Sequence, residues 1–160
     1  MIGLDDQIDL RRHEADLFIR PTSLDLPELE ETHLLKCQMM LYASPEYISE
    51  KGYIYDKKDL KNHSFISYGE EQYRTYKNID WYVTLAGKKP IITINQSFGA
   101  CTVASQGMGV ISWPHPISMP SQFNLELISK KVTGPEIDIY SYHNPKSDKT
   151  VLINFFIEHL

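Results

Sequence analysis

The segment from Ile91 to Pro114 constrains the fold of this chain more than any other. Its opening apolar residues predict a strand, and the polar pair Asn95–Gln96 predicts a turn. The residues that follow predict a short helix that is capped by Ser97 and ended by Gly107, before a second apolar strand. The segment therefore predicts a βαβ unit. Because its turn combines polar side chains with the free N–H groups of a helix start, it also predicts a place where a small polar or anionic ligand can bind.

Composition limits the kinds of partner that the chain can have. It has 160 residues, 42% of them hydrophobic, and a formal net charge of −5, which suits one core or two small lobes. Its Lys and Arg residues are scattered, so we do not expect it to bind nucleic acid by itself. It has no run of about 18 apolar residues, and its start lacks the pattern of a signal peptide. We therefore expect a soluble cytoplasmic protein that does not bind membranes.

Residues that carry catalysis or bind metals do not form a recognisable pattern. Cys37 and Cys101 lie in apolar runs without metal-type spacing, which predicts buried free thiols. The six histidines are dispersed, and no two of them are four residues apart. No phosphate-binding loop, serine-nucleophile elbow or zinc-protease motif is found. We therefore expect no enzyme, no metal and no cofactor.

The rest of the chain alternates predicted strands and short helices. Strands are predicted at Ala15–Arg20, Leu34–Ala43, Phe65–Tyr68, Leu125–Ile128 and Ile137–Tyr142, with a hairpin between Trp81–Leu85 and Ile91–Ile94. Helices are predicted from Pro45, after an N-cap at Ser44, to Gly52, from Asp56, and at the end of the chain, where Leu152, Phe155, Phe156 and Leu160 lie on one stripe. The acidic segment Thr22–His33 predicts a loop. This order favours an α/β fold with antiparallel additions.

Several short motifs follow one another in an order and spacing that are typical of one known domain. They are Asp16–Pro21, Met40–Ile48, Asp59–His63, Ala100–Pro114 and Phe155–Leu160. On these residues the chain resembles the effector-binding, or substrate-binding, domain of LysR-type transcriptional regulators. The resemblance extends from about Ile8 to Leu160.

The resemblance implies an α/β fold of the type 2 periplasmic-binding-protein kind, with two Rossmann-like lobes of which the first is incomplete. Residues 1–43 and 135–160 would form the remnant of lobe one, and residues 44–134 would form lobe two. The N-terminal winged helix-turn-helix and the start of lobe one are absent, so DNA would be bound only through a domain that this chain lacks. A thin lobe with exposed sheet edges also predicts a homodimer or a higher oligomer.

In this family the effector binds between the lobes, at strand ends and helix starts. The resemblance implies ligand contacts from Arg20, Pro21, Thr22, Ser67, Tyr68, Asn95, Gln96, Ser97, Phe98, Pro114 and His115. Structural roles for some of these residues stay open. Ser97 would serve as an N-cap, Arg20 would pair with Asp16 or Glu14, Phe98 and Trp113 would belong to the core, and His115 would be a surface residue without a task.

The predicted function is the sensing of a small metabolite by the effector domain of a LysR-type regulator. Arg20 and the polar turn at Asn95–Ser97 suit a carboxylate, and Tyr68, Phe98 and Trp113 suit an apolar body, which favours a small organic acid. An alternative is a truncated interaction module that oligomerises with intact regulators. A third hypothesis is an enzyme on the same scaffold.

Overall fold

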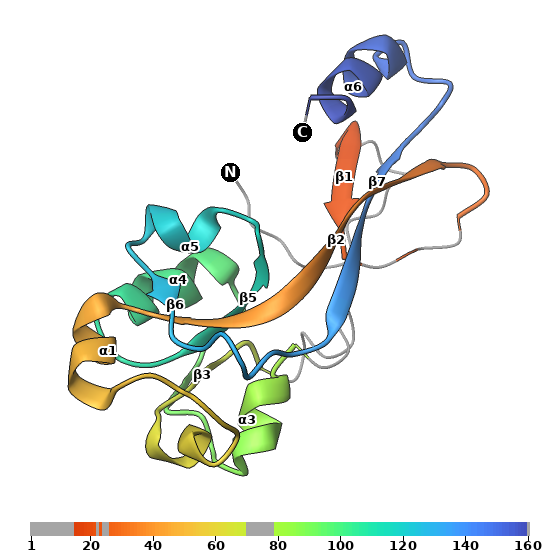
Figure 1. Cartoon of the computed structure of the whole chain (residues 1–160). Coiled ribbons are helices and arrows are strands. Elements are labelled where there is room, and N and C mark those ends of the chain that lie inside the picture. The colour runs from red at the N-terminus through yellow and green to blue at the C-terminus, as the bar shows by residue number, and fades with distance from the viewer. Residues whose placement is uncertain (1–14, 22, 24–25, 70–78, 160) are drawn as a thin grey trace. The chain divides into compact units, whose positions relative to one another are not determined.

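The computed structural model describes residues 15–21, 23, 26–69 and 79–159 (Figure 1). The chain divides into two compact units. Of the described residues, those between 37 and 136 belong to unit 1, and those between 15 and 36 and between 137 and 159 belong to unit 2. Two strands, β2 (Glu30–Ala43) and β7 (Glu136–His143), have residues in both units.

The other elements are short. In chain order they are β1 (Leu17–Arg20), α1 (Pro45–Lys51), the 3₁₀ helix η2 (Asp59–Asn62), β3 (Ile66–Ser67), α3 (Trp81–Ala86), β4 (Ile92–Thr93), α4 (Ser97–Ser105), β5 (Ile111–His115), α5 (Met119–Gln122), β6 (Glu126–Leu127) and α6 (Thr150–Ile157). None of the helices described here is long and apolar enough to cross a bilayer.

Strand pairing differs between the two units. In unit 2, β7 lies between β1 and the first half of β2, and β1 is antiparallel to β7. In unit 1, the second half of β2 pairs antiparallel with both β5 and β6. A separate parallel pair joins β3 to β4, with Ile66 opposite Ile92. Phe65, just before β3, also forms a parallel bridge with Val110, just before β5.

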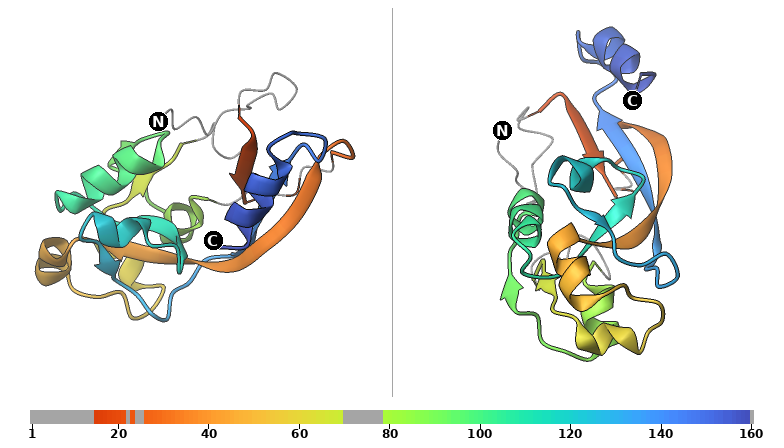
Figure 2. Two further views of the ribbon diagram at one scale, coloured as in Figure 1. Left: turned by 90° about the horizontal axis from the view of Figure 1, so that it is seen from above. Right: turned by 60° about the vertical axis from the view of Figure 1, so that its left-hand side comes forward.

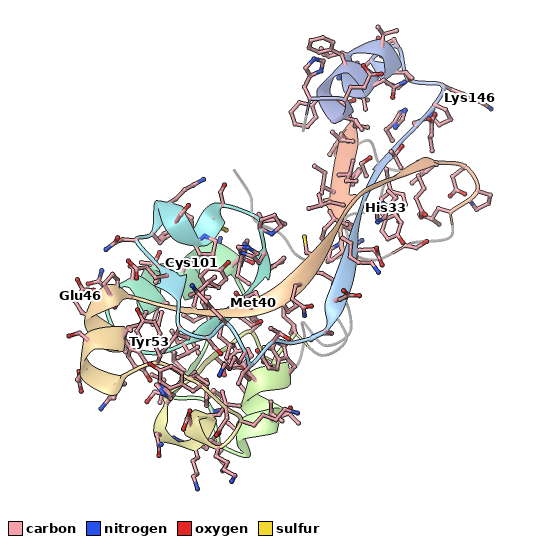
Figure 3. All side chains as sticks on the ribbon, viewed as in Figure 1. His33, Met40, Glu46, Tyr53, Cys101 and Lys146 are labelled. Atoms are coloured by element: carbon pink, nitrogen blue, oxygen red, sulfur yellow. The ribbon has the colours of Figure 1, made fainter. Side chains whose placement is uncertain are left out.

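The core of unit 1 lies on both sides of β2, because successive side chains of a strand point to opposite faces. Leu41 packs with residues of α1 and α3, including the fully buried Tyr82. Met40 packs on the other side with residues of α4, including Cys101; Figure 3 labels both residues. The ribbon views in Figure 2 show the helices of unit 1 around its strands. This arrangement of helices around strands confirms the predicted α/β fold. Both cysteines are free and buried, as predicted.

The helix predicted after Ser44 is confirmed with its caps. The Ser44 hydroxyl accepts a hydrogen bond from the Tyr47 N–H at 3.2 Å, and Pro45 is the first helical residue. Gly52 ends the helix with a φ of 81°, which costs little for a residue without a Cβ. The short helix predicted from Asp56 starts three residues later, at Asp59, and is the 3₁₀ helix η2.

The predicted hairpin between Trp81–Leu85 and Ile91–Ile94 is wrong. Trp81–Ala86 is helix α3, and β4 pairs in parallel with β3 instead. Asp80 occupies the N-cap position of α3, and Gly87 closes it in the left-handed region. The apolar run of α3 is so short that its periodicity does not distinguish strand from helix.

Part of the predicted acidic loop is also wrong, because Glu30–His33 begins the long strand β2. Polar contacts to β7 explain this extension. The Tyr142 hydroxyl donates to Glu31 Oε2 at 2.6 Å, and His33 Nε2 lies 2.9 Å from Asp138 Oδ1. These contacts join residues more than 100 positions apart, so no local pattern predicts them.

Two details of the predicted helices need correction. Gln96, not Ser97, is the N-cap of α4, and Ser97 is its first helical residue. At the C-terminus, Leu152, Phe155 and Phe156 of the predicted stripe are exposed, and the buried residue of α6 is Ile153. Leu160 lies outside the described residues.

Candidate ligand-binding site

The parallel pair β3 and β4 brings two of the predicted groups of site residues together in unit 1. Ser67 and Tyr68 stand at the carboxyl end of β3, and Asn95–Phe98 follow the carboxyl end of β4. The Ile94 N–H donates to the Ser67 carbonyl oxygen at 2.8 Å and holds the two ends side by side. Open α/β sheets bind their ligands at this edge of parallel strands.

Helix α4 starts at the same edge. Its first backbone hydrogen bond runs from the Ala100 N–H to the Gln96 carbonyl at 3.0 Å, so the N–H groups of Ser97, Phe98 and Gly99 precede the helical ladder. Gln96 makes no side-chain cap to these groups. These N–H groups lie at the positive end of a nine-residue helix, and such a helix start suits an anionic group.

Exposure separates the two groups of residues. Asn95, Gln96 and Phe98 are exposed, and the Phe98 ring is 59% exposed although its edge meets Phe123. Ser67 and Tyr68 are buried, at 5% and 3% exposure. The turn before α4 therefore forms the accessible surface of the site, and the end of β3 lies beneath it.

A buried carboxylate, Asp80, fixes the end of β3. Its Oδ1 accepts from the Tyr68 N–H at 3.1 Å, and its Oδ2 accepts from the Ser67 hydroxyl at 2.5 Å and from the Gly69 N–H at 3.3 Å. Asp80 has no exposed surface, so this carboxylate depends on these donors for its hydrogen bonds. The Ser67 proton is directed to Asp80, and the Ser67 oxygen accepts a hydrogen bond from the Gly69 N–H at 3.0 Å.

Sequence reasoning missed Asp80. A signal was present, since an Asp directly before six mainly apolar residues that a glycine follows is typical of a helix start. Tyr82, two residues later, donates its hydroxyl proton to the Ile66 carbonyl. Burial raises the pKa of the Tyr82 phenol well above its usual value, so Tyr82 stays a neutral donor beneath the site.

Pro114 and His115 end strand β5. Because Val110 bridges Phe65 in parallel, the chain enters β5 in the same direction as β3. The Tyr68 hydroxyl donates to the Ser112 carbonyl at 3.1 Å, which connects the end of β3 to β5. The exposed His115 shares a hydrogen bond of 2.8 Å between its Nδ1 and the Tyr42 hydroxyl.

The remaining predicted residues belong to unit 2. Arg20 ends β1 opposite Tyr140 and is half-buried, as is Pro21. Asp16, which we considered as a partner of Arg20, instead accepts from the Lys149 ammonium at 2.8 Å. Thr22 and Glu14 lie outside the described residues. Within the described part of the chain, no group of three His, Cys, Asp or Glu residues is placed to hold a metal ion.

In this α/β domain, parallel strands end beside the N-terminus of a helix. This arrangement is typical of ligand-binding domains. The sequence matches the family model of the LysR substrate-binding domain over residues 3–160, so the chain belongs to this family. It is a regulatory, effector-binding domain of the LysR-type transcriptional regulators and has the type 2 periplasmic-binding-protein-like fold of that family. The predicted family and fold class are thereby confirmed.

Solved structures of related domains agree. The regulatory domain of CrgA from Neisseria meningitidis superposes with a TM-score of 0.71 at 18% identity, covering 96% of this chain and 79% of that domain. The regulatory domain of AphB from Vibrio vulnificus gives 0.64 at 20% identity, with 97% and 79% covered. Full-length AphB from Vibrio cholerae gives 0.66 at 16% identity, and the present chain spans 56% of its length. No curated protein sequence matches significantly.

Proposed function

We propose that this chain binds a small organic acid as the effector of a LysR-type regulator. The observation that carries the proposal is the parallel pairing of β3 with β4, which sets Ser67–Tyr68 beside Asn95–Phe98. The carboxylate of the acid would accept hydrogen bonds from the N–H groups at the start of α4. The exposed Phe98 ring would contact its apolar body, and Asn95 and Gln96 would supply polar contacts.

The other predicted contacts complete this proposal. Ser67 and Tyr68 would act from beneath, as the floor that Asp80 holds in place. Pro114 and His115 would contribute from the end of β5, and Arg20, Pro21 and Thr22 from unit 2. Residues 44–134 would correspond to lobe two of the family, and residues 1–43 with 135–160 to part of lobe one. We propose that binding is the function, that the protein works in the cytoplasm, and that it contacts DNA only through a separate DNA-binding domain.

A thermal-shift screen against organic acids, amino acids and inorganic anions tests the proposal. A ligand at about 100 times its Kd should stabilise the native state by about 2.7 kcal/mol. The melting temperature should rise with one acid and should not rise with the corresponding neutral amide. A cooperative melt that no compound in the panel shifts would count against the proposal.

Variants then locate the site. Ser97→Ala and Phe98→Ala should weaken binding of the acid that the screen identifies, and Arg20→Ala tests the contribution of unit 2. Ser121→Ala is the matched control in unit 1, because Ser121 is exposed on α5, and Lys146→Ala is the control in unit 2. Equal affinities of Ser97→Ala, Phe98→Ala and the controls would place the ligand elsewhere.

A second candidate function is that of an interaction module, and helix α6 favours it. Val151, Leu152, Phe155 and Phe156 are 83%, 68%, 60% and 48% exposed, so this eight-residue helix presents most of its apolar surface outward. Covering a large apolar side chain stabilises a complex by about 1.5–3 kcal/mol. We propose that a second copy of the chain, or an intact regulator of the family, covers this surface.

The oligomeric state tests this second candidate. Light scattering should give the mass of a dimer or larger oligomer, and Phe155→Glu should shift the mass toward that of the monomer. Lys146→Glu changes charge by two units on an exposed residue of the same unit and serves as the control. A monomeric mass of the unaltered chain that does not change on mixing with an intact regulator would reject the interaction module.

A further inference from the structure

A cavity lies in unit 1, and none of the residues proposed above lines it. It has a volume of about 310 Å³ and is lined by Tyr53, Ile54, Tyr55, Leu127, Ile128, Ser129, Lys130 and Lys131. One wall follows helix α1, where Figure 3 labels Tyr53, and the other contains the end of β6 and the residues after it. We refer to this cavity as the tyrosine–lysine groove.

Backbone contacts hold the two walls of the groove together. The Ile54 N–H donates to the Ile128 carbonyl at 3.0 Å, and the Ile128 N–H donates to the Leu41 carbonyl of β2 at 3.0 Å. Ile54 and Ile128 are 1% and 0% exposed, so both walls are anchored in the core. The groove is therefore formed before any ligand arrives, which lowers the entropic cost of binding.

The two tyrosines leave large aromatic surfaces open. Tyr53 and Tyr55 are 49% and 64% exposed, and their ring centroids lie 6.3 Å apart with the planes tilted by 53°. Tyrosine provides a large contact area at low conformational cost, because only two side-chain torsions become fixed. These rings are suited to contact the apolar or aromatic part of a ligand.

The other wall supplies positive charge. The buried Ser129 hydroxyl accepts hydrogen bonds from the Val132 N–H at 2.9 Å and from the Lys131 N–H at 3.3 Å, which fixes the turn that carries Lys130 and Lys131. Both lysines are exposed, and no Asp or Glu side chain lines the groove. Of the neighbouring acids, Asp56 accepts from the Lys58 N–H at 2.6 Å. Two lysines on a groove that has apolar walls and no lining acid complement an anion.

From this combination we infer that the tyrosine–lysine groove is a second binding site, which takes a small amphipathic carboxylate. Its volume is at the lower end of the range for ligand sites, about 300–1,000 Å³, so the ligand is small. The apolar body lies against Tyr53 and Tyr55, and the carboxylate lies between the ammonium groups of Lys130 and Lys131. No residue of the groove belongs to the site at the start of α4, so the two sites do not overlap.

Nuclear magnetic resonance of the ¹⁵N-labelled full chain, titrated with sodium 4-phenylbutyrate, tests the inference. Amide shifts should concentrate at residues 53–55 and 127–132. The Lys130→Ala/Lys131→Ala double variant should bind the probe about fivefold more weakly or worse, since one exposed ion pair contributes up to about 1 kcal/mol. Neutral 4-phenyl-1-butanol should lose affinity to a similar extent, because it keeps the apolar body and lacks the charge.

One control variant and the contradicting outcomes make the test decisive. Lys89→Ala removes an exposed lysine of the same unit outside the groove and should leave the affinity within about twofold. Shifts at residues 95–99 or 151–156, no binding at millimolar probe, or equal binding by the double variant would each overturn the inference. An acidic peptide that shifts the groove amides when 4-phenylbutyrate does not would assign the groove to a protein partner and would also overturn it.

Discussion

Asp80 accepts a hydrogen bond of 2.5 Å from the Ser67 hydroxyl, and this contact joins the start of α3 to the end of β3. The same carboxylate also accepts from the N–H groups of Tyr68 and Gly69. A side chain outside the proposed contact set thus fixes three consecutive residues at the edge of the site. Correct positions of Ser67 and Tyr68 depend on Asp80 as a positioning residue.

Removing the Asp80 carboxylate should destabilise unit 1. Asp80→Ala removes the acceptor of the Ser67 hydroxyl and of the Tyr68 N–H, whereas the Gly69 N–H keeps the Ser67 oxygen at 3.0 Å. Each buried unsatisfied group costs about 1–3 kcal/mol. We expect a loss of about 3 kcal/mol or more in the free energy of unfolding, measured by urea denaturation. Glu50→Gln is the control, because the Glu50 side chain is 71% exposed, and it should change stability by less than about 0.5 kcal/mol.

Asp80→Asn separates the charge of this residue from its shape. The amide keeps one acceptor oxygen but replaces the other by a donor, which faces the Ser67 hydroxyl or a backbone N–H. We expect a smaller loss than for Asp80→Ala, about 1–2 kcal/mol. An Asp80→Asn variant as stable as the unaltered chain would show that the carboxylate is not needed as a double acceptor.

Gly109 should not tolerate a side chain. A Cβ on Gly109 would lie 2.8 Å from the Ser64 carbonyl oxygen, which is backbone next to β3 and has little freedom to move. Gly109→Ala should therefore destabilise the protein by about 1–3 kcal/mol in urea denaturation. Gly87→Ala is the comparison, because Gly87 has open space around it and only its φ of 62° opposes a Cβ. A loss for Gly109→Ala that is no greater than that for Gly87→Ala would contradict the steric account.

Local sequence signals were sufficient to predict a helix where the capping residues lie at both of its ends. Ser44, Pro45 and Gly52 lie within nine residues and each has one physical role, so α1 was predicted with correct ends. The βαβ unit was predicted for the same reason, since Gly107 follows α4 with a φ of 74°. Its exact start was missed, because the sequence does not show whether Gln96 or Ser97 takes the extended N-cap conformation.

Contacts between residues that are far apart in the chain determine the structural features that were not predicted from the sequence. The sequence of Glu30–His33 predicts an acidic loop. The residues form a strand because Glu31 contacts Tyr142 and His33 contacts Asp138 on β7. The sequence marks Asp80 only as the start of a helix, because Ser67, Tyr68 and Gly69, which it holds at the site, lie 11 to 13 positions earlier in the chain. The contacts of the candidate site were predicted only through the family resemblance, whereas the pairing of β3 with β4 gives them a physical basis.

Acidic pH should weaken unit 1 through His63. Burial is the main cause that lowers the pKa of this imidazole from its ordinary 6.5, and Lys88 and Lys51 add to it, whereas Asp59 opposes it. The unfolded chain therefore binds more protons than the folded chain just below pH 6.5, so the stabilisation is complete above this pH and decreases as the pH falls. His63 is 2% exposed, and its Nδ1 has no hydrogen-bond partner among the described residues, so protonation has no compensating acceptor there.

Urea denaturation between pH 7.5 and pH 5 measures this effect. The free energy of unfolding of the unaltered chain should decrease relative to that of His63→Gln as the pH falls below about 6.5, because Gln does not titrate. The measured quantity is the difference in the free energy of unfolding between the two proteins at each pH. A loss of stability that is the same at every pH therefore does not affect the result. A difference that stays the same over this range would show that His63 titrates alike in the folded and unfolded chain.

The Cys101 thiol should be inert in the folded protein. Burial raises its pKa from 9.0 to about 11, and the side chain is 0% exposed on the inner face of α4. The thiolate is the reactive form, so at pH 8 only about one molecule in 1,000 carries it, before any steric protection. In Cys37→Ala, where Cys101 is the only thiol, Ellman's reagent should react at least about 100-fold more slowly with the native protein than with the urea-unfolded protein. Rapid modification of the native variant would mean that α4 opens readily, and the donors at its N-terminus would then be a poor anchor for a carboxylate.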